Sequence, residues 1–176
     1  WSAVAALARG ALAAPETTSM GRLFDAVAAL CGIRTEVNYE GQAAIELEAA
    51  AEPGDHGRYE LPITAELLLD ARPAMSAIAG DAAAGVPVGI VSARFHDAVA
   101  AATAGACELA ASRHGLDTVV LSGGVFLNRR LLEATAAALR GAGLRVLVPE
   151  RLPPGDGGIS YGQAAVAAAI DNRSQL

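Results

Sequence analysis

Aromatic residues are scarce in this chain of 176 residues. They make up 4% of the sequence, whereas hydrophobic residues of all kinds make up 53%. The apolar content therefore consists mainly of Ala, Val, Leu and Ile, which favours closely packed helices and β-branched strands over a core of large rings. The length suffices for a core of ordinary size, and we expect residues 1–176 to form a single domain.

Cysteine is scarce as well. Cys31 and Cys107 belong to no CxxC pair and have no histidine beside them. This spacing excludes a zinc signature and a disulfide framework. We expect both thiols to be reduced and buried in a cytoplasmic protein.

The sequence also has no excess of positively charged residues. The sequence has 13 Lys and Arg against 19 Asp and Glu, which gives a formal net charge of −6 and a pI of about 5.0. Nucleic acids and anionic membranes are therefore not expected as partners. Every apolar run of transmembrane length is interrupted by a charge, Gly or Pro, which argues against a transmembrane helix. The sequence starts at Trp1 without an initiating Met, so we expect a piece of a longer chain.

The first part of the sequence has mainly helical patterns. Apolar residues recur at helical spacing, Ser19 or Thr18 suits a helix start, and Pro73 suits a first helical turn. Helices are expected over residues 1–13, 20–31, 42–51, 72–84 and 88–114. In the last of them, Gly89 and Gly105 indicate close contacts with other helices.

The second part of the sequence mixes strands with helices. A strand is predicted over residues 58–63, where Pro62 favours the edge of a sheet. A buried strand over 116–122, a helix over 128–143, a strand over 144–150 and a helix over 159–170 then follow. This order with short loops predicts parallel strands. We divide the domain into a helical part, about residues 1–57, and an α/β part, about residues 58–172.

Two glycines lie between the first of these parallel strands and the next helix. Gly123 and Gly124 let the backbone approach a flat or anionic ligand, and a helix N-terminus offers free N–H groups. Asn128 carries a donor and an acceptor suited to a ribose or a base edge. These features suit a nucleotide at the carboxyl end of a parallel strand, although a tight turn without a ligand would have the same residues.

A second glycine-rich loop, "PPGDGGISYGQ", follows the next strand. Its Asp156 either caps the following helix or holds a divalent metal against a phosphate. Because both loops follow parallel strands, we expect them to open onto one edge of the sheet. Their convergence favours a nucleotide site over two unrelated turns.

Five stretches together resemble one family. "TTSMGRLFDAVAALCGI", "YEGQAAIELEA", "ARFHDAVA", "LSGGVFLNRRLLE" and "PPGDGGISYGQAAVAA" are similar, in this order, to the C-terminal part of the HypF carbamoyltransferases, which mature nickel–iron hydrogenases. The resemblance covers residues from about 15 to 170. It implies an α/β fold of the actin-like ATPase type (ASKHA, RNase H-like), with a mainly parallel sheet flanked by helices. Within that fold the chain resembles the second lobe of a TsaD-like domain.

The resemblance also implies a reaction. HypF enzymes make carbamoyl adenylate from carbamoyl phosphate and ATP, and pass the carbamoyl group to the C-terminal cysteine of HypE. That group becomes a cyanide ligand of the hydrogenase iron. The implied cofactors are ATP or carbamoyl adenylate and a divalent metal (Mg, Fe or Zn), and the implied partners are a HypE-like protein and the rest of a HypF chain.

The resemblance implies roles for four positions in the loops that follow the parallel strands. Gly123 and Gly124 match the backbone platform of the adenylate, and Asn128 matches an Asn that faces the nucleoside. Asp156 matches a metal-ligand Asp. The family's partner ligands are histidines in an HxxxH-like motif, which this sequence lacks.

Further implied positions lie in the helical part. Glu46 matches an acidic residue that binds ribose hydroxyls, although a solvated helix residue is the other interpretation, and Gly41 would let its segment approach the ligand. Thr18 stands where TsaD-type relatives carry an Asp, and is counted with the nucleotide-binding positions. His96, on a long Ala-rich helix, is interpreted as a hydrogen-bonded packing residue. No histidine is assigned a catalytic role, and no catalytic residue is assigned.

Motifs of the other HypF domains are absent from the sequence, so it resembles the second lobe of the last domain only. We therefore expect this chain to be inactive alone. The nucleophile would be the thiolate of the partner, so that neither Cys31 nor Cys107 is needed. Two alternatives stay open: a TsaD-type relative that transfers threonylcarbamoyl to tRNA, and a non-catalytic ATP-binding or scaffolding lobe.

Overall fold

The computed structural model describes residues 5–7, 9 and 17–173. The helix predicted over residues 1–13 lies largely outside them. The elements, in chain order, are α2 (Met20–Leu30), α3 (Gln42–Ala50), α4 (Arg72–Ala83), α5 (Val88–His114), β1 (Thr118–Val120), the 3-10 helix η1 (Gly124–Leu127), α6 (Arg129–Gly141), β2 (Arg145–Leu147), the 3-10 helix η2 (Asp156–Gly158) and α7 (Ile159–Arg173).

The helix ends follow the local sequence. The Ser19 side chain accepts a hydrogen bond from the backbone N–H of Arg22 and so caps α2, and Pro73 lies in the first turn of α4. Gly115 has a φ of 64° and ends α5 in the left-handed conformation that glycine adopts without strain. The predicted helices over residues 20–31, 42–51, 72–84 and 88–114 are thereby confirmed.

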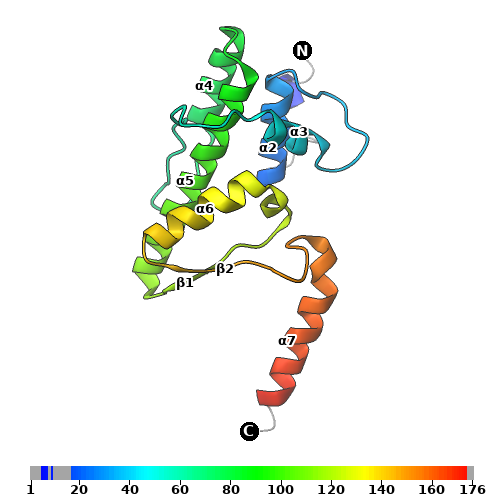
Figure 1. The fold of residues 1–176 in the computed structure, drawn as a ribbon, viewed down its shortest axis with the longest axis vertical. Helices are drawn as coiled ribbons and strands as arrows, with labels where there is room; N and C mark the ends of the chain where they lie inside the picture. The colour runs from blue at the N-terminus through cyan, green and yellow to red at the C-terminus, as the bar shows by residue number, and fades with distance from the viewer. Residues whose placement is uncertain (1–4, 8, 10–16, 174–176) are drawn as a thin grey trace.

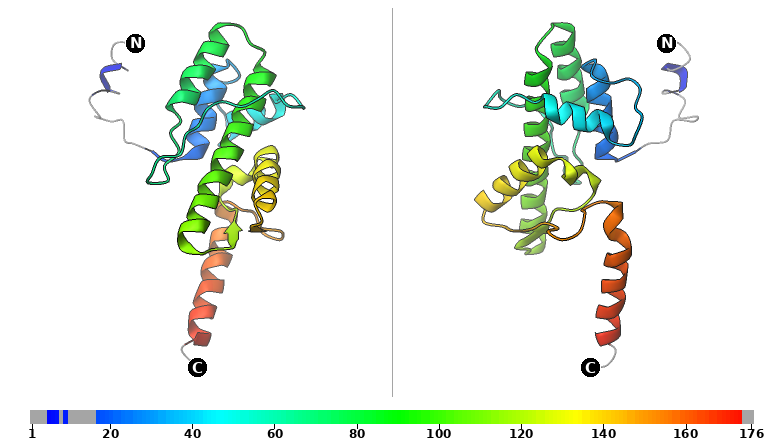
Figure 2. Two further views of the ribbon diagram at one scale, coloured as in Figure 1. Left: turned by 90° about the vertical axis from the view of Figure 1, so that its left-hand side faces the viewer. Right: turned by 45° about the vertical axis from the view of Figure 1, so that its right-hand side comes forward.

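Helices α2, α3 and α4 pack against the N-terminal half of the long helix α5 (Figures 1 and 2). Phe24 of α2 and Phe95 of α5 meet edge to face at the centre, with ring centroids 4.8 Å apart. Residues of all four helices are buried around this pair: Val27, Leu47, Ile78, Val91 and Val99. This helical core is the larger of two cores in the described part of the chain.

Gly89 and Gly105 mark close approaches to α5, as predicted, but of the contacting residues only Ala50 belongs to a helix. A Cβ atom at position 89 would lie 2.6 Å from Cγ of Glu52 and 2.9 Å from the carbonyl oxygen of Ala50. A Cβ atom at position 105 would lie 3.1 Å from Cδ1 of Ile63. The chain that follows α3 therefore packs directly on the α5 backbone.

Strands β1 and β2 form a parallel pair, with Val119 opposite Val146 and Val120 opposite Leu147. Helix α6 packs against one face of the pair, through a small core that includes Leu139. The predicted parallel strands and the α/β fold are confirmed. The prediction that the first strand is buried is wrong in part, because Val120 of β1 is 63% exposed. Opposite it, Leu147 of β2 is 40% exposed. Parallel sheets are usually covered on both faces, and here one face is open.

The segment that precedes α4 forms no regular strand, so the strand predicted over residues 58–63 is wrong. Tyr59 and Leu61 do alternate inward, but they pack on the helical core, and the nearest pairing is one isolated bridge between Ile63 and Leu69. The side chains of this segment alternate as in a strand, but its backbone has no neighbouring strand with which to pair. Helices and core continue across the boundary predicted near residue 58.

Helix α7 extends away from the rest of the chain in every view (Figures 1 and 2). Each residue from Ile159 to Asp171 is exposed. Within the described ranges, no helix combines the length and apolar character needed to cross a membrane.

Candidate functional site

The two glycine-rich loops meet at the carboxyl ends of β1 and β2. The backbone N–H of Gly123 donates a hydrogen bond to the carbonyl oxygen of Pro154 at 2.7 Å, and the Ser122 hydroxyl donates to the same oxygen at 3.2 Å. A Cβ atom built on Gly155 would lie 3.4 Å from Cα of Gly124. The expectation that both loops open onto one edge of the sheet is confirmed.

The glycines of these loops differ in what the fold demands of them. Gly123 has a φ of 102°, which side chains disfavour, and a Cβ atom on Gly158 would lie 2.7 Å from the Pro153 carbonyl oxygen. Both positions therefore need glycine for the fold itself. Gly124 has no such requirement, because no atom lies within 4 Å of the place where its Cβ would stand. Gly124 presents bare backbone at the point where the loops meet.

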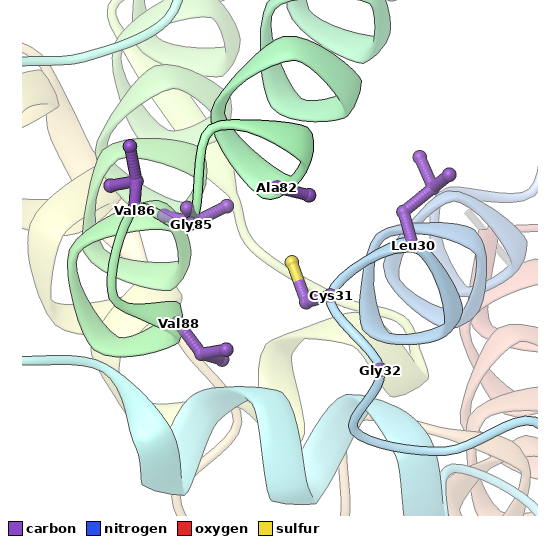
Figure 3. Close-up of a pocket in the computed structure, with 8 residues that line it drawn as sticks. Leu30, Cys31, Gly32, Ala82, Gly85, Val86 and Val88 are labelled. Atoms are coloured by element: carbon purple, nitrogen blue, oxygen red, sulfur yellow. The ribbon is translucent and has the colours of Figure 1, made fainter.

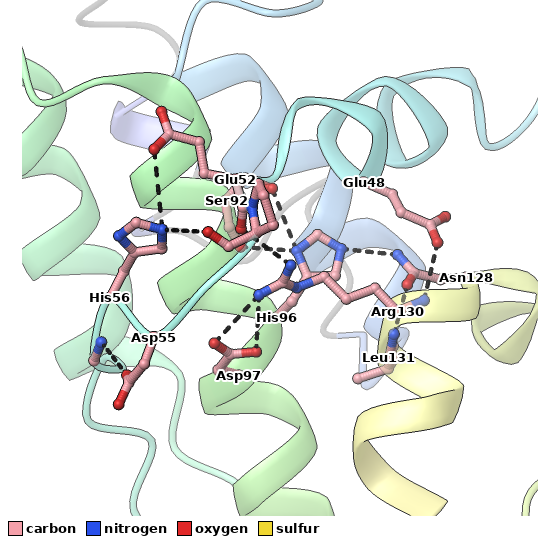
Figure 4. Close-up of polar contacts among 12 residues, drawn as sticks. Glu48, Glu52, Asp55, His56, Ser92, His96, Asp97, Asn128, Arg130 and Leu131 are labelled. Carbon is pink, nitrogen blue, oxygen red and sulfur yellow. Dashed lines mark hydrogen bonds and ion pairs between the residues drawn. The ribbon is translucent and has the colours of Figure 1, made fainter.

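Asn128 joins η1 to α6, and both ends of its side chain are bonded within the chain (Figure 4). Its Oδ1 accepts from the backbone N–H of Leu131 at 2.8 Å, which caps α6, and its Nδ2 lies 2.8 Å from Nε2 of His96. The residue is 9% exposed. The structure thus gives Asn128 a role in the fold, and contact with a nucleoside stays a prediction.

His96 is a fully buried packing residue, as predicted. Its ring makes edge contacts with the aromatic rings of both Phe24 and Phe95, and its Nδ1 is 2.8 Å from the carbonyl oxygen of Ser92. Burial lowers the pKa of His96 below its ordinary value, because the charged form is poorly solvated there. The Ser92 carbonyl opposes this shift, and its effect is smaller.

The N-terminus of α6 already carries an anionic group. Oε1 of Glu48 accepts from the backbone N–H of Arg130 at 3.0 Å (Figure 4). The Arg130 guanidinium reaches Asp97 at 3.3 Å and the carbonyl oxygen of Glu52 at 3.2 Å, so α3, α5 and α6 are joined here. With Glu48 and Asn128 in place, the α6 N-terminus has fewer free donors for a phosphate than the sequence indicates.

Glu48 and Arg130 were not singled out from the sequence. The two residues are 82 positions apart, and only the packing of α3 beside α6 brings them together. The position of Arg130, two residues after the Asn128 cap, does not indicate in the sequence that it contacts Glu48.

The predicted residue Glu46 is held by neighbours in the helical part. Both of its carboxylate oxygens accept from Nε of Arg34, at 3.0 and 2.8 Å, and Oε1 also accepts from the Gln42 amide at 3.1 Å. The hydrogen bond from Arg34 lowers the pKa of Glu46. Gly41 caps the same helix with a φ of 81°, so the turn itself accounts for glycine there. The ribose role of Glu46 and the role of Gly41 near a ligand stay predictions.

Asp156 and Thr18 are both exposed. Asp156 starts η2, directly ahead of α7, and Thr18 precedes the Ser19 cap of α2. Among residues 5–7, 9 and 17–173, no group of three or more His, Cys, Asp or Glu side chains lies close enough to hold a metal ion. A single exposed carboxylate does not fit a metal site, and Asp156 belongs to no such group in this part of the chain.

Neither cysteine resembles an activated nucleophile. Cys31 and Cys107 are free and half-buried, and burial raises the pKa of both thiols. Cys31 faces a cavity of about 300 Å³ between the end of α2 and the connection from α4 to α5 (Figure 3). The labelled side chains around it are aliphatic, and none would stabilise a thiolate.

Comparisons with known proteins were made by sequence and by structure. The family model described as "Carbamoyltransferase, Kae1-like Domain, second subdomain" matches residues 1–163. The carbamoyltransferase HypF of Synechocystis is 39% identical over 85% of this chain and 19% of its own length, and that of Rhizobium leguminosarum is 38% identical over 94% and 21%. A carbamoyltransferase HypF homolog of Cupriavidus necator is 38% identical, over 94% of this chain and 44% of its own length.

The solved structures that are similar to this chain include two of HypF proteins. A crystal structure of full-length HypF in the phosphate- and nucleotide-bound form matches 86% of this chain with a TM-score of 0.82 and 42% identity. The HypF structure of T. kodakarensis matches 85% of it with a TM-score of 0.76 and 28% identity. These matches cover 20% and 19% of those chains, so the chain spans about a fifth of their length.

Proposed function

Because this chain belongs to the HypF family of carbamoyltransferases, we propose that it forms one lobe of a carbamoyltransferase site that holds the adenylate part of carbamoyl adenylate. The carbamoyl group passes to the C-terminal cysteine of a HypE-like protein, as a step in the synthesis of a hydrogenase cyanide ligand. The rest of a HypF chain supplies the remainder of the site.

The meeting of the two glycine-rich loops carries this proposal. Ligands of open parallel sheets bind outside the carboxyl ends of the strands, and both loops lie there. Gly124 leaves its backbone uncovered at the contact, so a flat or anionic group can approach closely. The nucleotide-bound state of the related full-length HypF supports a nucleotide as the ligand.

The reaction is an acyl-type transfer from a mixed anhydride. The thiolate of the partner attacks the carbamoyl carbon, and AMP leaves with the electron pair of the broken anhydride bond. The developing charge on the phosphate needs fixed donors, and the uncovered amides near Gly124 are the candidates in this chain. The raised pKa values of Cys31 and Cys107 keep these thiols protonated, so they do not compete as nucleophiles. Among the described residues no three metal-ligating side chains come together, so no step of the transfer is assigned to a metal.

The open side of the strand pair supports the proposed partnership with the rest of a HypF chain. Val120 and Leu147 are exposed on neighbouring strands, and Leu127 is exposed in the first glycine-rich loop. Exposed apolar side chains on neighbouring strands are typical of a surface that another segment covers.

Nucleotide binding is tested by titrating AMP-PNP and Mg²⁺ into the chain while its backbone amides are followed by NMR. The amides of Gly123, Gly124 and Gly155 should shift together. Gly124→Ala adds a methyl group that the fold accommodates, and it should weaken binding by about tenfold, the equivalent of roughly 1.4 kcal/mol.

Gly80→Ala is the matched control, since position 80 also has open space for a methyl group and lies in α4, away from the loops. Its affinity should equal that of the unchanged chain. No shift of the three loop amides at millimolar AMP-PNP would contradict the nucleotide site and leave the scaffolding interpretation.

The acceptor requires a separate test. A HypF-family chain that carries this lobe in place of its own is incubated with carbamoyl phosphate, ATP and either a peptide ending in cysteine or tRNA. Mass spectrometry should find the carbamoyl group on the peptide. Modification of the tRNA instead would favour the TsaD-type alternative.

A further inference from the structure

A line of buried polar groups runs from α5 to the N-terminus of α6. The carbonyl oxygen of Ser92 lies 2.8 Å from Nδ1 of His96, Nε2 of His96 lies 2.8 Å from Nδ2 of Asn128, and Oδ1 of Asn128 accepts from Leu131 (Figure 4). Ser92 and His96 are fully buried. The line reaches Asn128, the last residue of the first glycine-rich loop (residues 122–128), and ends in the first turn of α6.

The backbone groups at the two ends fix every proton in this line. The Leu131 N–H can only donate, so the Asn128 oxygen faces Leu131 and the Asn128 NH₂ faces His96. His96 must therefore accept at Nε2, which leaves its proton on Nδ1. That proton points at the Ser92 carbonyl, which can only accept. One state satisfies all these groups, a neutral imidazole protonated at Nδ1.

We propose that His96 is a positioning residue for the first glycine-rich loop, residues 122–128: the neutral ring fixes the Asn128 amide, and that amide fixes the start of α6. The loop has an anchor at each end. Gly123 is bonded to Pro154 at one end, and Asn128 is bonded to His96 at the other. The contacts between His96 and Asn128 do not depend on what the loop binds. The effect of His96 on nucleotide affinity, in contrast, rests on the proposed function.

Protonation of His96 would break this arrangement. An imidazolium has no acceptor, so its Nε2–H would face the NH₂ of Asn128. If the amide turned to offer its oxygen, its NH₂ would face the Leu131 N–H and the α6 cap would be lost. Either outcome leaves a buried donor without a partner, which is unfavourable.

Charged groups from three helices face His96. Arg130 of α6 disfavours its protonation, whereas Glu48 of α3 and Asp97 of α5 favour it. Helix α2 contributes the ring of Phe24, which carries no charge. Burial outweighs these charges and lowers the pKa of His96 below the ordinary value of 6.5. The unfolded chain therefore binds the proton more tightly, and stability is lost as the pH falls from about 6.5 toward the pKa of the folded state.

The tautomer is tested by long-range ¹H–¹⁵N NMR of the histidine rings in the 176-residue chain. At pH 7 the His96 ring should show the neutral pattern with the proton on Nδ1. As the pH is lowered, the amides of Gly124 and Leu131 should shift with the same midpoint as His96. A His114→Gln control removes an exposed histidine and should leave that midpoint unchanged. A proton on Nε2 at pH 7, or loop amides that ignore the His96 midpoint, would overturn the proposal.

Asn128→Asp sharpens the test without removing the helix cap, because Asp caps helices as well as Asn. The carboxylate offers His96 an acceptor in place of a donor. The pKa of His96 should then rise above 6.5, and a proton should appear on Nε2. An unchanged tautomer and pKa in this variant would show that Asn128 does not set the state of His96.

Nucleotide affinity gives the functional readout. The affinity for AMP-PNP should fall about fivefold as the pH passes downward through the His96 midpoint, the equivalent of one neutral hydrogen bond. His96→Gln offers an amide oxygen to Asn128 and has no proton to gain, so this step should vanish from its pH profile.

The two possible failures are distinguishable. If AMP-PNP does not bind at any pH, the proposed function fails, while the tautomer and Asn128→Asp results still decide the positioning role. If AMP-PNP binds, but neither its affinity nor the shifts of the loop amides change at the pH midpoint of His96, only the positioning role fails.

Discussion

The helical region, residues 20–114, buries its apolar side chains, whereas the strand region, residues 118–173, leaves many of them exposed. In the helical region, aromatic and aliphatic side chains of four helices close around Phe24 and Phe95. In the strand region, one face of β1 and β2 and the residues of α7 from Ile159 to Asp171 are exposed. The helical region therefore has a complete core, whereas the strand region holds apolar surface that the described residues leave uncovered.

The largest contrast is expected between Phe95→Ala and Val120→Ala. Phe95 is fully buried, and its truncation leaves a cavity beside Phe24, so the free energy of unfolding should fall by about 3–5 kcal/mol. Val120 lies on the open face of β1, and its truncation should change stability by less than about 0.5 kcal/mol. Urea unfolding followed by circular dichroism measures both. Equal losses would mean that the strand region is as closed as the helical region.

A smaller contrast tests how tightly the helical region is packed. Gly89→Ala places a methyl group 2.6 Å from Cγ of Glu52 and 2.9 Å from the Ala50 carbonyl oxygen, and should destabilise the chain by about 1–3 kcal/mol. Gly80→Ala, in α4, meets no atom within 4 Å and should stabilise it by about 1 kcal/mol through helix propensity.

Thermal unfolding of the two variants should therefore shift in opposite directions. The comparison holds residue type and helical backbone constant and changes only the close contact. If both variants gained stability, the segment after α3 would not press on α5 in solution.

Local signals sufficed for most helices and for the order of the parallel strands. Gly115 ends α5, and Ser19 starts α2, through bonds to residues within a turn or two, so the sequence contains all that is needed. The segment 58–63 shows the limit of local signals. Its alternating residues fit a strand, but a strand also needs a partner backbone, and the helical core took its apolar side chains instead.

In the candidate site, the placement of the loops was predictable from the sequence, whereas the long-range hydrogen bonds were not. The two glycine-rich loops follow parallel strands, and this alone places them at one edge of the sheet. The bonds from Asn128 to His96 and from Arg130 to Glu48 span 32 and 82 residues. Such pairs depend on how α3 and α6 pack beside α5, which no local pattern encodes. The open face of the strands was missed for the same reason, since exposure depends on what covers them.

The smallest expected effect bears most directly on the strand region. Val166 of α7 is 55% exposed, whereas Val99 of α5 is buried, so a Val→Ser change can be compared in two helices. Val and Ser have similar helix propensities, and the difference between the variants therefore reports burial. Val166→Ser should change the free energy of unfolding by less than about 0.5 kcal/mol, within the range of surface substitutions, and Val99→Ser should lower it far more. Chemical denaturation of both variants decides between them. A large loss for Val166→Ser in this chain would mean that α7 docks onto it in solution. A loss that appears only when the lobe is placed in a longer HypF-family chain would instead locate the missing cover of α7 in the rest of that chain.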